Sequence, residues 1–167
     1  MPSFTLRSAR TSDVAGIRLL VRPLADQRVL LEKEAVAYFE SLQEFIVAED
    51  GGNLLGCGAL HVMWEDLAEV RTLATNETAR GQGIGKALLR ELVERARVIG
   101  VKRLFCLTFE VDFFRAMGFE VMEIQSAVDP EVYSELLRST DEGVAEFLDL
   151  ARVKPNTLGN TRMIMTL

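Results

Sequence analysis

The feature that most restricts the fold of this chain is a change of hydrophobic period on either side of a glycine-rich segment, residues 80–86. Before it, residues 68–75 are β-rich and typical of a strand. After it, apolar residues recur at helical spacing up to Gly100, a natural helix stop. These apolar residues are Ile84, Leu88, Leu89, Leu92, Val93, Ala96 and Ile99. A strand, a tight turn and a long amphipathic helix therefore follow one another.

The other elements predict an α+β fold with one mixed, mostly antiparallel central sheet flanked by helices. Residues 45–49 and 54–64 are strands joined by Asp50-Gly51-Gly52-Asn53, a strong hairpin signal. Residues 104–108 are apolar throughout, as in a strand buried on both faces. Because this strand follows the long helix, a right-handed crossover to a parallel neighbour is expected.

Further elements complete this prediction. Strands are expected at 4–7, 118–124 and 162–167, and helices at 111–117 and 130–138. A helix that begins at Val14 is ended or kinked by Pro23, and a second one over 30–42 has Val36 and Phe39 on its apolar side. Ser139 and Glu142 are spaced as a capping box, so another helix is expected after Ser139.

Length and charge limit the classes of function. The chain has 167 residues with 19 basic and 25 acidic side chains, a net charge of −6. One domain over residues 1–167 is expected. The acidic balance argues against nucleic-acid binding, although a local basic patch can still hold a small anion.

No apolar run approaches the roughly 18 residues of a membrane span, and no signal peptide is evident. Cys57 and Cys106 indicate buried, reduced thiols, so a cytoplasmic protein without a metal site is predicted.

The glycine-rich segment is the part of the sequence that carries chemistry. Its glycines let the backbone turn sharply and approach a ligand closely. The first amides of the following helix have no internal partners, and the helix dipole favours an anion there. Arg80 and Lys86 add positive charge. The glycines are not in the G-x-G-x-x-G order of a dinucleotide fold, and Ala87 after Lys86 excludes a P-loop. Besides the dinucleotides and the nucleotides of P-loop proteins, coenzyme A is the third class of ligand that such a turn could bind.

Arg80-x-x-Gly83-x-Gly85 after a strand resembles the acetyl-CoA loop of the Gcn5-related N-acetyltransferase (GNAT) superfamily, and Gly118-Phe119 after a short helix is similar to a second superfamily motif. The likeness extends over residues 4–124. It implies a single GNAT-type N-acetyltransferase domain, a splayed site beside the strand from Val70 to Thr75, and acetyl-CoA as co-substrate. The cofactor contacts that it implies are Leu73, Ala74, Thr75, Arg80, Gly81, Gln82, Gly83, Ile84, Gly85 and Lys86.

Within the superfamily, the chain resembles the acetyltransferase domain of bacterial N-acetylglutamate synthases at residues 21–24, 44–49, 56–60 and 68–74. This resemblance implies transfer of an acetyl group to the α-amine of L-glutamate or glutamine by direct attack in a ternary complex, the first step of arginine biosynthesis. The typical enzyme carries an amino-acid-kinase domain in front. Because this chain begins at the acetyltransferase strand, a stand-alone short form is expected, and the family commonly forms homodimers.

The reaction needs a base, because a free amino acid brings a protonated amine. Glu69 on the strand is the first candidate, and Glu110 at the end of the next strand is the second. His61 alternates with apolar neighbours and is interpreted as structural. Many superfamily members place a general-acid tyrosine where this chain has Phe114, so the leaving thiolate is expected to take its proton from water or from the amine.

An anionic acceptor needs cations, and arginine gives planar, bidentate recognition of carboxylates. Arg22 in the Arg-Pro-Leu motif, Arg71 on the strand and Arg28 are the candidate substrate-binding residues, and Arg18 joins Arg22 and Arg28 in a basic cluster. Two alternatives stay open. One is a GNAT enzyme for a peptide, polyamine or aminoglycoside amine, and the other is a non-catalytic acetyl-CoA-binding module.

Overall fold

A computed structural model describes residues 3–30, 33–123, 128–157 and 159–167 of the chain. In this part, seven strands form one sheet with the order β1-β2-β3-β4-β5-β7-β6. β4 and β5 are parallel, whereas the pairs β1–β2, β2–β3, β5–β7 and β6–β7 are antiparallel. The predicted mixed, mostly antiparallel sheet is therefore confirmed. The strands are β1 (Thr5–Ser8), β2 (Phe45–Asp50), β3 (Asn53–Trp64), β4 (Leu67–Thr75), β5 (Arg103–Thr108), β6 (Glu120–Val121) and β7 (Thr161–Thr166).

The contacts divide the chain into two compact units, the first with residues 1–61 and 70–99 and the second with residues 62–69 and 100–167. The α-helices are α1 (Val14–Asp26), α2 (Ala35–Glu40), α3 (Ile84–Ile99), α4 (Val111–Ala116), α5 (Pro130–Leu136), α6 (Glu142–Phe147) and α7 (Lys154–Thr157). Among the described residues, none of these helices combines the length and apolarity that a membrane span requires.

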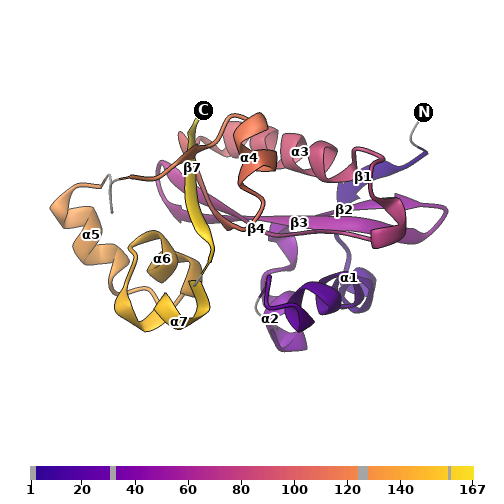
Figure 1. Cartoon of the computed structure of the whole chain (residues 1–167), viewed down its shortest axis with the longest axis horizontal. Coiled ribbons are helices and arrows are strands. Elements are labelled where there is room, and N and C mark those ends of the chain that lie inside the picture. The colour runs from indigo at the N-terminus through magenta and orange to yellow at the C-terminus, as the bar shows by residue number, and fades with distance from the viewer. Residues whose placement is uncertain (1–2, 31–32, 124–127, 158) are drawn as a thin grey trace. The chain divides into compact units, whose positions relative to one another are not determined.

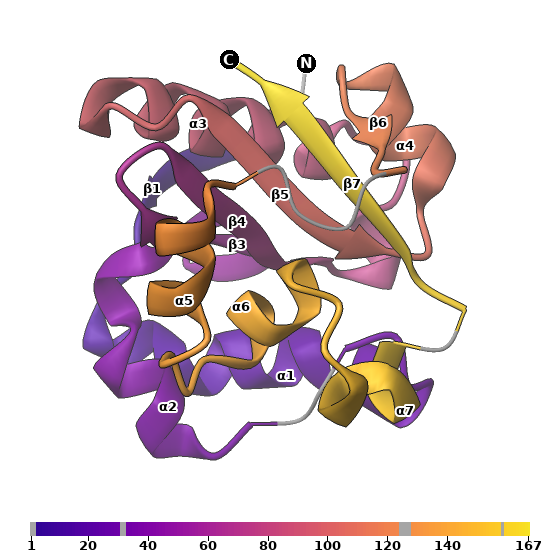
Figure 2. The same cartoon turned by 90° about the vertical axis from the view of Figure 1, so that its left-hand side faces the viewer.

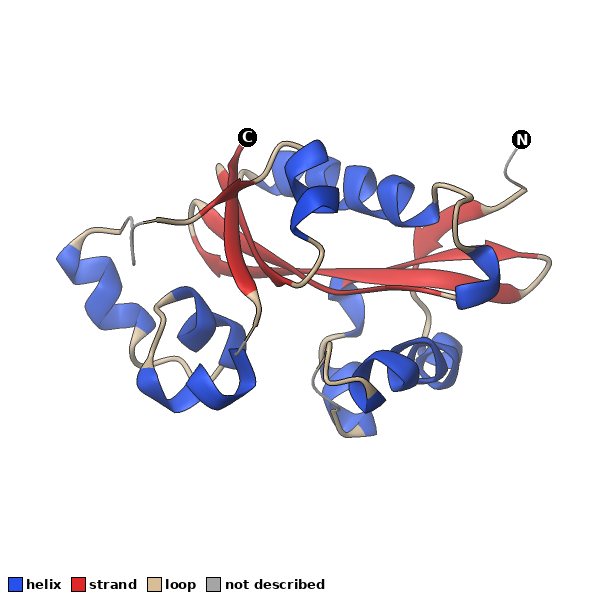
Figure 3. Cartoon of the chain, in the orientation of Figure 1, coloured by secondary structure: helices blue, strands red, loops and turns tan. Residues whose placement is uncertain are grey.

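The first unit has helices on both faces of its strands (Figure 1). α1 and α2 cover one face, and α3 covers the other (Figure 3). Glycines in β3 let α3 pack closely, because a Cβ atom at Gly58 would lie 2.9 Å from Leu92 and one at Gly56 would lie 2.9 Å from both Ile84 and Leu88. The buried cluster under α1 and α2 comprises Val14, Ile17, Leu20, Val21, Tyr38, Phe45, Val47, Cys57, Ala59 and Ala74.

The second unit has a core of its own, in which β5 packs with α5 and α6. The Phe105 and Phe147 rings meet edge to face with centroids 5.4 Å apart. β7 runs between β5 and β6 (Figure 2). Arg162 of β7 donates from Nε to the Glu146 carbonyl at 3.1 Å, and its Nη2 donates to the Phe147 carbonyl. These bonds tie the C-terminal strand to the end of α6.

The connection between α1 and β2 differs from its prediction. The helix expected over 30–42 is limited to α2, with residues 31–32 outside the described part. Val36 and Phe39, expected on the apolar side, are 59% and 50% exposed, whereas Tyr38 is 3% exposed. α1 continues past Pro23 to Asp26, because a proline removes one helical donor but leaves its carbonyl, which here accepts from the Gln27 amide at 3.2 Å.

The region between β5 and β7 also differs from its prediction in detail. Asp141, not Ser139, caps α6, since its carboxylate accepts from the Val144 amide at 3.1 Å. The Ser139 hydroxyl instead accepts from the Asp141 amide. The strand expected at 118–124 is confined to β6, although residues 124–127 lie outside the described part. α7 was not expected, because its sequence has no apolar periodicity.

Candidate active site

β4 carries a local distortion beyond its pairing with β5. The parallel register with β5 covers Leu67, Ala68 and Glu69 of β4. Farther along, Thr72 has a φ of +55°, a left-handed conformation that is an outlier for a β-branched residue. The Thr72 carbonyl oxygen lies 3.4 Å from Sγ of Cys57 on β3. A strained residue inside a strand marks an irregularity of the bulge type, and such features are concentrated at functional sites.

The backbone of β4 after Thr72 presents one edge to β3 and the other edge away from it. The Ala74 amide lies within hydrogen-bonding reach of the Cys57 sulfur, and the Asn76 amide donates to the Leu55 carbonyl at 2.8 Å. Alternate residues of a strand direct their backbone groups to opposite sides. The backbone groups of Leu73 and Thr75 therefore point away from β3, on the edge that a further extended segment would pair with.

The glycine-rich segment forms the turn that the sequence predicts. A 3-10 turn, Glu77–Ala79, comes first, and the side chain of its cap residue Asn76 accepts from the Thr78 amide at 3.0 Å. Gly81 and Gly83 have φ values of +81° and +79°, with open space where a Cβ atom would lie. These conformations favour glycine.

The N-terminus of α3 opens directly from this turn. The Gly83 carbonyl accepts from the Ala87 amide at 3.0 Å, so the helical hydrogen bonds begin at Gly83. Ile84 is 2% exposed and anchors the helix, whereas Arg80 and Lys86 are exposed beside its first amides. Gly81, Gln82 and Gly83 are exposed as well, and Gly85 is half-buried. Helix dipole, amides and cations are thus placed for an anionic ligand.

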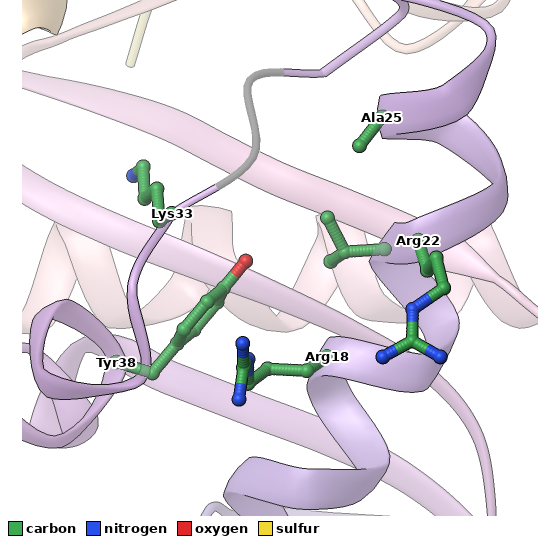
Figure 4. Close-up of a pocket in the computed structure, with 6 residues that line it drawn as sticks. Arg18, Arg22, Ala25, Lys33 and Tyr38 are labelled. Carbon is green, nitrogen blue, oxygen red and sulfur yellow. The ribbon is translucent and has the colours of Figure 1, made fainter.

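A basic pocket lies between α1 and α2 (Figure 4). Arg18 and Arg22 extend into it from α1, Lys33 from the connecting segment, and Tyr38 from α2, with Val21 and Ala25 completing the lining. Neither Arg18 nor Arg22 forms an ion pair with any residue in the described part of the chain. The positive charges of Arg18 and Arg22, one helical turn apart, repel each other. An anion bound between them would offset this repulsion, so the pocket favours an anionic ligand.

The other predicted substrate-binding residues lie elsewhere. Arg28 follows α1, is exposed with a φ of +59°, and does not line this pocket. Arg71 is half-buried on β4, one residue before Thr72. Sequence reasoning placed Arg18 in the basic cluster but did not find Lys33 or Tyr38 as neighbours, because both reach the pocket through the tertiary packing of a separate segment.

The two candidate bases differ in environment. Glu69 on β4 is 5% exposed, whereas Glu110 is exposed where α4 begins, with its amide donating to the Thr108 hydroxyl at 2.8 Å. Burial and then the charge of Glu69 raise the pKa of the Cys106 thiol well above its ordinary range, so Cys106 stays protonated. Of the two candidate bases, Glu69 is therefore the buried one and Glu110 the solvated one.

The side chains of His61 and Phe114 are both held in packed or hydrogen-bonded surroundings. Nδ1 of His61 lies 2.6 Å from Oε1 of Glu44, in a partly buried pair that agrees with a structural interpretation of this histidine. Phe114 is 5% exposed and packs edge to face against Phe113 and Phe119, with centroid distances of 5.2 and 5.1 Å. This cluster has no hydroxyl group that could protonate a leaving thiolate.

Together, a mixed sheet, a distorted strand with a backbone edge facing away from its neighbour, and a glycine-rich turn into a long helix define the class of acyltransferases that use acetyl-CoA. The model of the acetyltransferase (GNAT) family matches residues 18–119. The chain belongs to this family, which confirms the superfamily resemblance of the sequence.

Curated relatives lie within the same family. The chain is 50% identical over 165 residues to a protein named amino-acid acetyltransferase from Mycobacterium tuberculosis, a match that covers 97% of this chain and 94% of that protein. It is 36% identical over 118 residues to an amino-acid acetyltransferase from Neisseria meningitidis, covering 70% of this chain but only 27% of that longer protein.

Solved structures agree with these relatives. Rv2747 from M. tuberculosis, in complex with CoA and NLQ, matches with a TM-score of 0.93 and 49% identity, covering 98% of this chain and 99% of that one. N-acetylglutamate synthase from Neisseria gonorrhoeae, complexed with coenzyme A and N-acetyl-glutamate, matches with a TM-score of 0.78 and 25% identity, covering 100% of this chain and 36% of that one.

Proposed function

We propose that this chain is an amino-acid N-acetyltransferase that moves the acetyl group of acetyl-CoA to the α-amine of L-glutamate or glutamine, the first step of arginine biosynthesis. The observation that carries the proposal is the 50% identity to an amino-acid acetyltransferase over nearly the full length of both chains. The basic pocket on α1 supports it, because an amino acid brings at least one carboxylate for arginine side chains to bind.

In this proposal, backbone atoms of the first unit hold the co-substrate. The diphosphate of acetyl-CoA binds the amides of residues 81–86, with charge supplied by Arg80 and Lys86. The extended pantetheine arm pairs as an added strand with Leu73 and Thr75, whose backbone groups point away from β3. A backbone amide after the distorted Thr72 then stabilises the oxyanion that forms on the thioester carbonyl.

The acceptor is held by side chains rather than by backbone. Arg22 binds a carboxylate of the amino acid, and Arg18, one turn away in the same pocket, adds the second guanidinium. Arg71 and Arg28 remain proposed contacts, and of these two the half-buried Arg71 on β4 is supported by its position next to Thr72.

Proton transfer completes the reaction. The ammonium group of the acceptor must lose a proton before its nitrogen can attack, and we propose Glu69 as the base, directly or through water, with Glu110 as the second candidate. Attack by the neutral amine forms the C–N bond, and collapse of the tetrahedral intermediate breaks the C–S bond. The leaving thiolate takes its proton from water or from the amine, because Phe114 has no proton to give.

The proposal also covers the type of acceptor, the cellular location and the oligomeric state. Its acceptor is a free amino acid, its location is the cytoplasm, where acetyl-CoA and amino acids are available, and its assembly is a homodimer. Light scattering at several concentrations tests the homodimer.

The function is tested by the release of free thiol from acetyl-CoA in a screen of the common amino acids, polyamines, peptides and aminoglycosides. We expect turnover with glutamate or glutamine. Turnover restricted to polyamines, peptides or sugars would assign the chain to another acceptor class, and cofactor binding without turnover would assign it to a non-catalytic module.

A further inference from the structure

The buried thiol of Cys57 is in contact with the distorted part of β4. Cys57 is fully buried on β3, and its Sγ lies 3.4 Å from the Thr72 carbonyl oxygen. The same sulfur is within hydrogen-bonding reach of the Ala74 amide. One side chain therefore touches the backbone on both sides of Leu73.

The Thr72 carbonyl needs such a partner. Thr72 is 8% exposed and has a φ of +55°, so its peptide group does not lie in a regular ladder. A buried carbonyl without a hydrogen bond is destabilising, and nearly all of them in proteins have a partner. An S–H group is a weak donor, and the Cys57 thiol provides such a hydrogen bond to the Thr72 carbonyl.

The thiol keeps the proton that this bond requires. Burial raises the pKa of Cys57 to about 12, and the nearby Ala74 amide offsets this effect only in part. At neutral pH the group is therefore a neutral S–H that donates to Thr72 and accepts from Ala74. It is not a thiolate nucleophile, and no covalent step is assigned to it.

We propose that Cys57 is a positioning residue for acetyl transfer, because its S–H bond to the Thr72 carbonyl fixes the distortion of β4 and thereby aims the backbone of Leu73 at the thioester. This inference rests on the proposed function. Cys57 contacts neither substrate; it acts through the main chain. Misplacement of such a group by about 1 Å can cost on the order of 100-fold in rate.

Three substitutions separate this role from simple packing. Cys57→Ser keeps a donor and an acceptor, Cys57→Ala removes both and shortens the side chain, and Cys57→Val removes both but fills the site with a larger apolar side chain. Val47→Ala is the matched control, since Val47 is fully buried and lies directly opposite Cys57 in the β2–β3 register. It weakens the same core without touching the Thr72 carbonyl.

The experiment measures kcat and KM for the amino acid that the unmodified chain acetylates, together with the melting temperature of each variant. We expect kcat to fall about tenfold in Cys57→Ala and Cys57→Val. KM for the acceptor should stay within about twofold, and Cys57→Ser should recover part of kcat. Val47→Ala should lose melting temperature but keep kcat.

Unchanged kcat in Cys57→Val, an equal fall in Val47→Ala, or no recovery by serine would overturn the inference while leaving the proposed function intact. If Cys57→Ala does not fold, the comparison of Cys57→Ser with Cys57→Val decides. Absence of turnover in the unmodified chain would instead refute the proposed function, and this inference with it.

Discussion

Two sets of arginines in the first unit show opposite uses of the same side chain. Arg7 on β1 is fully paired: its guanidinium donates to both Asp13 oxygens at 2.7 and 3.0 Å and to Glu49 at 2.7 and 3.1 Å. Arg18 and Arg22 on α1 share a pocket and, within the described residues, have no acidic partner. An arginine whose guanidinium is bound to carboxylates stabilises the fold. Two arginines without an acidic partner are available to bind an anionic ligand.

The hydrogen bonds of Arg7 also shift the pKa values of Asp13 and of Arg7 itself. Hydrogen bonds from Arg7 hold the pKa of Asp13 below its ordinary value, and the bonds to Asp13 and Glu49 raise the pKa of Arg7. The Asp13 side chain is only 9% exposed, so its charge depends on Arg7. Loss of Arg7 should therefore affect folding, and loss of Arg22 should affect turnover.

The largest effect is expected from Arg22→Ala. Removal of a carboxylate-binding guanidinium should cost about 2–5 kcal/mol in transition-state binding, seen as a fall in kcat/KM for the acceptor. Calorimetric binding of CoA should be unchanged, because the pocket on α1 is made by other residues than the glycine-rich turn. Arg90→Ala, an exposed arginine on α3, is the control. Unchanged acceptor kinetics in Arg22→Ala would remove this residue from the site.

Arg7→Met should act on stability instead. It leaves the Asp13 carboxylate largely buried without its partner, and we expect the free energy of unfolding to fall by about 2 kcal/mol, between the values typical of buried and of surface pairs. Urea unfolding measures this change. Arg138→Met, which removes an exposed pair with Glu135, should change stability by less than about 0.5 kcal/mol. Equal effects of the two substitutions would contradict the comparison.

Arg18→Gln should have a smaller effect on turnover than Arg22→Ala, about a tenfold rise in the acceptor KM with kcat nearly unchanged. The reason is that Arg18 supplies charge to a carboxylate that Arg22 still binds. The double variant should lose less than the two single effects combined, since the residues share one ligand. Strict additivity would indicate that the two arginines bind different groups.

The smallest effect is expected in the dependence of folding stability on acidic pH. Because the pKa of Asp13 is lowered in the folded chain, the stability that this group contributes is present above its ordinary pKa of 3.8 and is lost as the pH falls through the lowered value. The unfolding free energy of Asp13→Asn should therefore be lower at pH 7 and should depend less on pH below 4. A parallel acid dependence in both proteins would show that Asp13 does not titrate as described.

Local patterns in the sequence predicted much of the fold. The strand before the glycine-rich turn, the turn itself and α3 follow from hydrophobic period and glycine content, which act over a few residues. The basic pocket could be predicted only in part. Arg22 was found from its motif. The apolar side of the second helix was instead assigned to Val36 and Phe39, and the burial of Tyr38 depends on how α2 packs against α1.

The distortion at Thr72 was beyond sequence reasoning. The run Val70-Arg71-Thr72-Leu73 is β-rich and reads as a regular strand, and nothing in it indicates a positive φ. Cys57 was predicted to be a buried small residue, which is confirmed, but its bond to the Thr72 carbonyl depends on the pairing of β3 with β4. The cap of α6 is Asp141 rather than Ser139, because both side chains can accept from nearby amides and the pattern alone does not choose between them. Ser139 accepts from the Asp141 amide, and Asp141 accepts from the Val144 amide.

The way Leu73 and Thr75 direct their backbone has an evolutionary consequence. Most substitutions change a side chain but keep the backbone amide and carbonyl. Contacts made by main-chain atoms, such as those proposed for the co-substrate, can therefore persist while the amino-acid sequence changes. The pocket on α1, which we propose for the acceptor, depends on guanidinium groups, so one nucleotide change at Arg22 would remove the proposed carboxylate contact. In a lineage of such enzymes, new acceptors should therefore arise from changes in the first helix, while the strand and turn that we propose to bind the coenzyme stay as they are.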